Sequence, residues 1–187
     1  MTLGLGLYTP LALAGSIFYI IHHITVKTAL FLVSGITERA TGTQQLHEMG
    51  GLLNTYPMVA TLFMLAALSL AGMPPLSGFF AKLALLTAGV QEAQYFYVGV
   101  ALLGSLLTLV SLSKIYIYVF WGEEKPKRAR AVRHTDLLLP TAFLVLITVA
   151  LGLIGEPVFQ PVQQAATQLF SRETYIEAVF AAAQGAK

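Results

Sequence analysis

Four long segments of this chain are almost free of formal charge, and they constrain its fold more than any other feature. These segments are residues 9–37, 57–91, 93–122 and 137–155. Together they hold only three charged side chains, Lys27, Lys82 and Lys114. The whole chain has 187 residues, of which 56% are hydrophobic and 11% charged, whereas a typical soluble domain has about 25% charged residues. We therefore predict an all-α, polytopic membrane protein with about four spans.

Three of the segments have the length of an ordinary transmembrane helix. A helix that crosses the hydrocarbon core needs about 20 apolar residues, because about 30 Å must be covered at about 1.5 Å per residue. Residues 9–37, 93–122 and 137–155 meet this requirement. We expect the first helix to begin near Pro10, since proline is tolerated in the first turn of a helix.

The segment 57–91 is too long for one straight span and contains Pro74, Pro75 and Gly78 near its middle. Two prolines remove two backbone donors and clash with the preceding turn, so a regular helix cannot continue through them. The segment is then either one span broken at the prolines or a hairpin of two short helices. We favour one broken span, because irregular backbone at membrane depth is tolerated where it lines a polar cavity, as in many transporters.

The orientation follows from the loop 122–136, which holds nearly half of the basic residues. These are Lys125, Lys127, Arg128, Arg130 and Arg133. Basic loops stay on the inner side of the membrane, so we expect this loop to be cytoplasmic in a cell membrane. With four spans, the loop 38–56 is also cytoplasmic; the hairpin alternative would move it outside.

The last part of the chain, residues 157–187, differs from the membrane portion 1–156 in having an apolar side and a polar side. The apolar side is formed by Val158, Phe159, Val162, Leu169 and Phe170. Such a pattern is typical of a helix that lies on the membrane surface. A loosely packed terminal helix is an equally good interpretation of the same residues.

Lys27 lies well inside its span, and a charge at that depth should face a bundle interior or a wet cavity. Tyr19, His23 and Lys27 follow one another at four-residue spacing and so share one helix face, whereas His22 points elsewhere. A row of histidine and lysine can pass protons by hydrogen-bond exchange, because both can titrate near neutral pH when buried. The alternative is that His23 and Lys27 only hydrogen-bond to a neighbouring helix.

The other two lysines have different surroundings. Lys82 follows the double proline by about two turns, where free backbone groups can hold water beside an ionisable side chain. We therefore group it with His23 and Lys27 as a candidate proton relay, with Tyr19, His22 and Lys114 as further candidates. Lys114 lies about two turns from Gly122, and its long side chain favours snorkelling to the cytoplasmic interface.

Several classes of site are excluded by what the sequence lacks. It has no cysteine, so it has no iron–sulfur cluster or thiolate metal site, and we expect no cofactor and no metal. No basic–aromatic module or phosphate-binding glycine loop indicates nucleic acid or nucleotide. No acid occurs within any of the four segments, although a lysine relay usually needs a titratable partner. That partner must come from elsewhere.

Three stretches resemble a known family. They are residues 22–32 with Gly35, residues 48–57, and residues 70–82 with its double proline. This combination is similar to the antiporter-like subunits shared by Mrp-type cation/proton antiporters, respiratory complex I and membrane-bound hydrogenases. The segments 120–122 and 175–179 look most like the D-type subunit of the Mrp-type antiporters, so we identify the chain as the C-terminal part of a subunit of that type.

The resemblance implies roles for particular residues. His23 and Lys27 match the central proton-relay positions, and Lys82 matches the ionisable residue on the broken helix. Tyr19 occupies a place where some relatives carry a second histidine. The family is longer than this chain, and its first inverted repeat, with an essential glutamate–lysine pair, is absent from these residues. The expected partners are thus the remaining half of the same protein, other subunits of a hetero-oligomeric antiporter, the lipid bilayer, protons and Na⁺.

Two other functions fit the same residues. The chain could be a proton-pumping membrane subunit of an NADH:quinone oxidoreductase or of a membrane-bound hydrogenase, in which case the redox chemistry lies in partner subunits. It could also be a scaffold that only packs against other subunits. Neighbouring genes would separate the first of these from an antiporter, and retained exchange after neutralising His23, Lys27 and Lys82 together would favour the scaffold.

Overall fold

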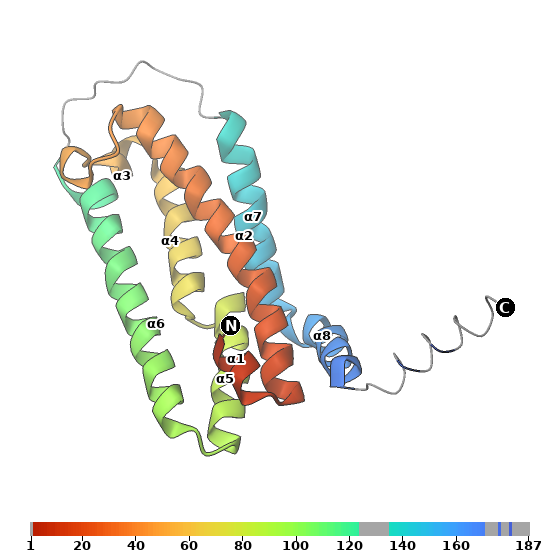
Figure 1. The fold of residues 1–187 in the computed structure, drawn as a ribbon. Coiled ribbons are helices and arrows are strands. Elements are labelled where there is room, and N and C mark those ends of the chain that lie inside the picture. The colour runs from red at the N-terminus through yellow and green to blue at the C-terminus, as the bar shows by residue number, and fades with distance from the viewer. Residues whose placement is uncertain (1, 124–134, 171–175, 177–179, 181–187) are drawn as a thin grey trace.

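The computed structural model describes residues 2–123, 135–170, 176 and 180, and within these ranges every regular element is helical (Figure 1). The helices are α1 (Thr2–Leu7), α2 (Pro10–Thr41), α3 (Leu52–Thr55), α4 (Pro57–Ala71), α5 (Ser77–Gln91), α6 (Tyr95–Tyr116), α7 (Thr135–Leu153) and α8 (Gly155–Phe170). A 3₁₀ turn at Leu46–Glu48 and a π-helical turn at Ile117–Trp121 complete the set.

Three helices are long and apolar enough to cross a membrane: Pro10–Thr41, Tyr95–Trp121 and Asp136–Leu153. They correspond to three of the four predicted segments, and the prediction of a polytopic helical bundle is confirmed. The start of α2 is also as expected, because Pro10 is its first residue and Thr9 caps it. The Ala12 backbone N–H donates to the Thr9 hydroxyl over 3.2 Å, which satisfies one of the free amides of the first turn.

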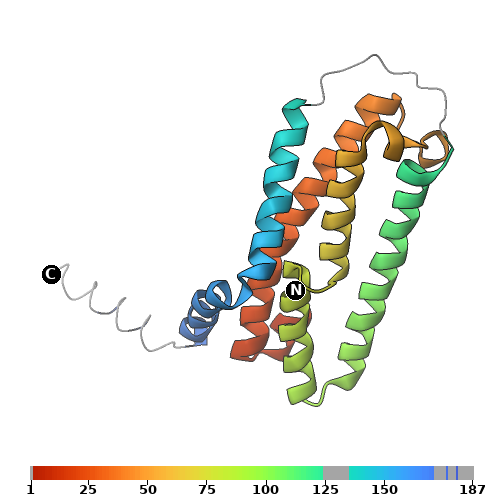
Figure 2. The same ribbon diagram turned by 180° about the vertical axis from the view of Figure 1, so that it is seen from behind.

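The fourth span is broken, as predicted, between α4 and α5. Helix α4 ends at Ala71 and is capped by Gly72, whose φ of +91° suits glycine. The amides of Gly72 and Met73 bond back to the Leu68 carbonyl over 3.1 and 3.0 Å. The cis-linked Pro74 and Pro75 follow. Figures 1 and 2 show α5 continuing in the direction of α4, offset from its end, so the segment is one discontinuous span and not a hairpin.

Helix α2 is the centre of the bundle. It packs against α4 and α5 on one side and against α7 and α8 on the other, while α6 lies beside both halves of the broken span (Figures 1 and 2). No residue of α6 is buried. The face of α6 that points away from the bundle is apolar, as expected of a helix that meets lipid or another membrane protein segment.

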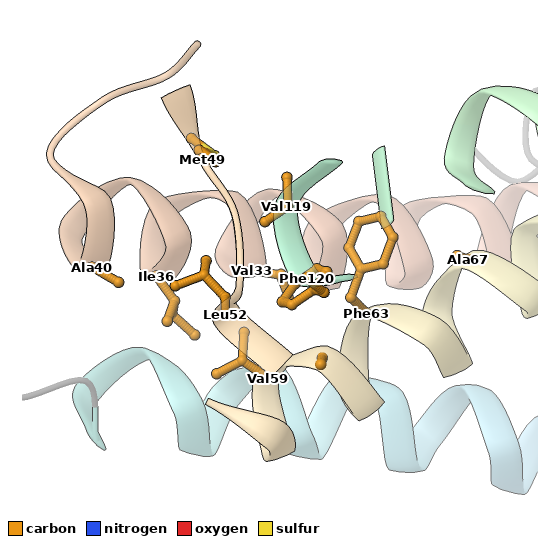
Figure 3. Close-up of a cluster of buried hydrophobic side chains, with 11 residues drawn as sticks. Val33, Ile36, Ala40, Met49, Leu52, Val59, Phe63, Ala67, Val119 and Phe120 are labelled. Atoms are coloured by element: carbon orange, nitrogen blue, oxygen red, sulfur yellow. The ribbon is translucent and has the colours of Figure 1, made fainter. Parts of the chain in front are cut away.

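The end of the bundle that contains α3 has an apolar core. Residues of α2, α4, α3 and the π-helical turn meet there, and Figure 3 shows Phe120 between Val33 and Phe63. The rings of Phe63 and Phe120 lie 5.4 Å apart between centroids. This core joins the C-terminal end of α6 to α2 and α4, so that α6 is held at the same end as the connection 42–56.

Helix α8 packs on the first half of α2 rather than standing apart from the bundle. Val162 and Ala166 are buried, and Phe159 meets Phe18 with ring centroids 5.9 Å apart. Phe170 contacts the ring of Tyr8, whereas Leu169 is 67% exposed and does not share the packed side. The predicted cytoplasmic loop lies mostly outside the described residues, as does most of the segment 175–179.

Candidate functional site

A cavity of about 350 Å³ lies between α2, α5 and α6. Its polar lining residues are Tyr19, His23, Lys27, Lys82, Ser105 and Thr108. Since a water molecule occupies about 30 Å³ of the liquid, such a volume holds on the order of ten waters. The cavity can therefore be a hydrated space that is bordered by three basic side chains.

Helix α2 supplies one wall of this cavity through the face predicted from its four-residue spacing. Tyr19 and His23 are half-buried, and their rings are stacked with centroids 5.6 Å apart and planes 26° apart. Lys27 lies one turn further along and is exposed at the cavity. The three side chains thus form a row along the α2 wall of the cavity.

Lys82 is anchored by the helix break. Its Nζ donates to the backbone carbonyls of Leu70 and Ala71 over 2.9 and 2.8 Å. These carbonyls belong to the last turn of α4, where no following helical turn supplies amide donors. The C-terminal end of a helix also carries partial negative charge, which favours a cation there. The break therefore creates the site that holds this lysine.

Gly72 makes room for that lysine. A Cβ added at residue 72 would lie 2.8 Å from Cδ of Lys82, closer than side-chain carbons approach one another. With its φ of +91° as well, the position combines two requirements that only glycine meets without strain. The residue that caps α4 is thus also the residue that admits the Lys82 side chain.

The remaining predicted residues lie outside the cavity. Lys114 is exposed near the C-terminal end of α6, with its Nζ 5.9 Å from the centre of the Tyr118 ring, a geometry that suits an interfacial anchor. Pro74 and Pro75 are exposed at the break, and Gly78 packs tightly under it. His22 is buried beside the cavity, against the start of α5, where its Nδ1 lies 2.8 Å from the Ser77 hydroxyl.

Sequence reasoning missed the hydroxyls of Ser105 and Thr108, which form the α6 wall of the cavity. Each donates to the carbonyl four residues earlier, Ser105 to Ala101 over 3.1 Å and Thr108 to Gly104 over 2.8 Å. Serine and threonine side chains commonly form such bonds in apolar helices, so their presence in α6 did not indicate that they line a cavity. Their three-residue spacing was the available signal, because it places them on one face.

The described ranges contain no group of three histidine, cysteine or acidic side chains placed to hold a metal ion. The lining residues of the cavity offer hydrogen-bonding and titratable side chains. Neutral imidazole can both donate and accept a proton, and lysine can donate one and take it back. Hydroxyls and water complete a hydrogen-bonded network between them.

Residues 1–108 match the family described as NADH:quinone oxidoreductase/Mrp antiporter, TM. The chain belongs to this family. Among its relatives, the D subunit of the Na(+)/H(+) antiporter of Alkalihalophilus pseudofirmus is 52% identical over 96% of the chain. The D subunit of the Bacillus subtilis Na(+)/H(+) antiporter is 43% identical over 94%. A chain of the Mrp complex from Dietzia sp. superimposes with a TM-score of 0.86 and 34% identity over 94% of the chain.

The chain spans only about a third of the two antiporter subunits, 36% of each, and 41% of the Dietzia protein. The family resemblance inferred from the motifs is therefore confirmed, and the antiporter-family fold extends over nearly all of this chain. Its long apolar helices and its membership of this family make the chain a multi-pass membrane protein.

Proposed function

We propose that this chain is part of a monovalent cation/proton antiporter subunit and carries part of its proton path. The single observation that carries the proposal is the cavity lined by His23, Lys27 and Lys82. Ionisable side chains within membrane spans are costly and are found where ions or protons move. The antiporter names of the two D-subunit relatives supply the reaction class.

In this proposal a proton moves along the cavity by hydrogen-bond exchange. His23 receives or delivers it at the α2 wall, in contact with Tyr19, and Lys27 exchanges it one turn further along. Lys82 uses two of its three ammonium donors on the Leu70 and Ala71 carbonyls, which leaves one donor for water in the cavity. The hydroxyls of Ser105 and Thr108 can accept from the same water.

The path is incomplete within these residues, because no acid lies in any of the four apolar segments. We infer that the counter-charge comes from the rest of a longer protein and that this protein works in a hetero-oligomeric complex in a cell membrane. Residues 1–156 then form the translocating portion, and residues 157–187 an accessory segment. The coupled cation is Na⁺ by analogy with the relatives' names.

The test is Na⁺-driven proton movement in everted vesicles that contain the complete antiporter complex. We expect Lys27→Ala and Lys82→Ala each to lower the initial exchange rate about tenfold or more, as loss of a proton-transfer group does. Lys114→Ala is the matched control, since it removes a lysine from a span but not from the cavity, and it should keep nearly full exchange. Wild-type exchange in both cavity variants would refute the proposal.

A further inference from the structure

Two consecutive histidines of α2 point in directions about 100° apart around the helix. His23 lines the cavity, whereas His22 is 1% exposed and lies against the first turn of α5. The proton path described above makes no use of His22. A buried, polar and titratable side chain that packs against a helix break calls for a specific explanation.

His22 belongs to a small polar layer at the break. Its Nδ1 lies 2.8 Å from the Ser77 hydroxyl, which in turn lies 3.4 Å from the Ser69 hydroxyl of α4. Ser69 and Ser77 are fully buried. The bond to His22 is the shorter of the two, so His22 is the main partner of the Ser77 side chain and joins α2 to the start of α5.

The backbone around Ser77 is packed without spare room. A Cβ at Gly78 would overlap the Ser69 carbonyl oxygen and would lie 2.9 Å from Nε2 of His22. On the α7 side, a Cβ at Gly152 would lie 2.7 Å from the Ser77 amide nitrogen. The first turn of α5 is therefore packed against α2, α4 and α7. Of these contacts, the one from α2 is the short hydrogen bond between the His22 ring and the Ser77 hydroxyl.

Ser77 and Lys82 are joined by one rigid helix. Ser77 is the first residue of α5, and Lys82 lies about one and a half turns further along. A shift or rotation of the first turn would move the Lys82 ammonium away from the Leu70 and Ala71 carbonyls, which lie on a different helix. Displacements of about 1 Å are enough to impair a proton-transfer site.

We propose that His22 is a positioning residue for Lys82, which acts through Ser77 to hold the first turn of α5 against α2 and α4. This inference rests on the proposed function only in taking Lys82 as part of the proton path. Nδ1 of His22 does the positioning. Its Nε2 is buried without a partner among the described residues, so it adds nothing to this link.

The positioning can be measured apart from transport. Leu86 lines the cavity one turn after Lys82, and these 187 residues contain no cysteine. In a complex in which every other cysteine is replaced by serine, the cysteine of Leu86→Cys reports the placement of α5 through its rate of reaction with a water-soluble maleimide. We compare the native His22 with His22→Leu, His22→Asn and Ser77→Ala in the assembled antiporter that carries Leu86→Cys. His22→Asn keeps a polar atom close to the position of Nδ1.

We expect His22→Leu and Ser77→Ala each to change the labelling rate about fivefold and to lower exchange about tenfold. The double variant should be no worse than either single one, because both remove the same link. His22→Asn should stay close to wild type in both measurements. Ser77→Ala removes one oxygen only, so it keeps the test decisive if His22→Leu prevents assembly.

Unchanged labelling in His22→Leu and Ser77→Ala would overturn the inference, even if exchange were lost. So would rescue by His22→Gln but not by His22→Asn, because glutamine places its amide near Nε2 and would indicate a role for that atom. If Lys27→Ala and Lys82→Ala both kept full exchange, the proposed function would fail, whereas the labelling rates would still test the link from His22 to α5.

Discussion

Two of the cavities among the described residues are nearly equal in size and very different in chemistry. One, of about 350 Å³, lies beside the helix break and is lined by His23, Lys27 and Lys82. The other, of about 340 Å³, lies at the opposite half of α2 and is lined mostly by apolar side chains, with Glu38 and Gln44 among them. Both are spaces between the helices of the bundle. Of the two, only the first is lined by titratable groups at successive helical turns.

The difference comes from the backbone beside each cavity. At the first, α4 stops and leaves two carbonyls that bind Lys82. At the second, α2 and α4 are continuous, and an aromatic cluster of Phe63, Tyr116 and Phe120 fills the space between α4 and α6. A lysine in a span needs acceptors that a regular helix does not offer, so the break decides where such a charge can be placed.

The largest effect is expected for Gly78→Ala, which changes a residue at the helix break itself. The added Cβ would overlap the Ser69 carbonyl oxygen, and because this is backbone, either α4 or α5 must move. We expect exchange to fall more than about tenfold, since Lys82 loses its two carbonyls. Gly99→Ala is the control, because nothing lies within 4 Å of its added Cβ. If the two variants showed equal exchange in vesicles, the geometry of the break would not be needed for transport.

Phe120→Ala should separate stability from transport. Phe120 is 1% exposed in the apolar core, and removal of a buried phenylalanine costs about 3–5 kcal/mol in a core that cannot collapse. We expect this protein to dissociate from the purified complex at a lower temperature, while the exchange rate per assembled complex stays close to wild type. A selective loss of exchange at full thermal stability would show that the apolar core and the cavity at the helix break are not independent.

A smaller effect is expected at the α6 wall of the first cavity. Thr108→Val removes a hydroxyl and keeps the shape of the side chain, so the water network in the cavity loses one partner. We expect exchange to fall about threefold, within the range of a lost neutral hydrogen bond, and Thr108→Ser to restore it. The measurement is the initial rate in vesicles at saturating Na⁺. An identical loss in Thr108→Ser would point to packing instead of the hydroxyl.

The fold could be predicted from the sequence because the membrane leaves few options. Long apolar segments require helices, and the double proline requires an interruption near residue 74. The row Tyr19, His23 and Lys27 could also be placed on one face, since helical spacing alone determines it. Two features could not be derived in this way. The link from His22 to Ser77 joins residues 55 positions apart, and the carbonyls that bind Lys82 are backbone atoms that no side-chain pattern reveals.

The smallest effect is expected for Glu38→Gln in the second cavity, and it is the sharpest check on the comparison. Glu38 is exposed and accepts a 2.8 Å hydrogen bond from the Gln44 amide. An exposed interaction of this kind contributes less than about 1 kcal/mol, and glutamine can still accept the bond. If the second cavity plays no part in proton movement, exchange should stay within about twofold of wild type, which is less than about 0.5 kcal/mol in activation free energy. A loss comparable to that of Lys82→Ala would instead place Glu38 in the path, and the path would then extend along the whole length of α2.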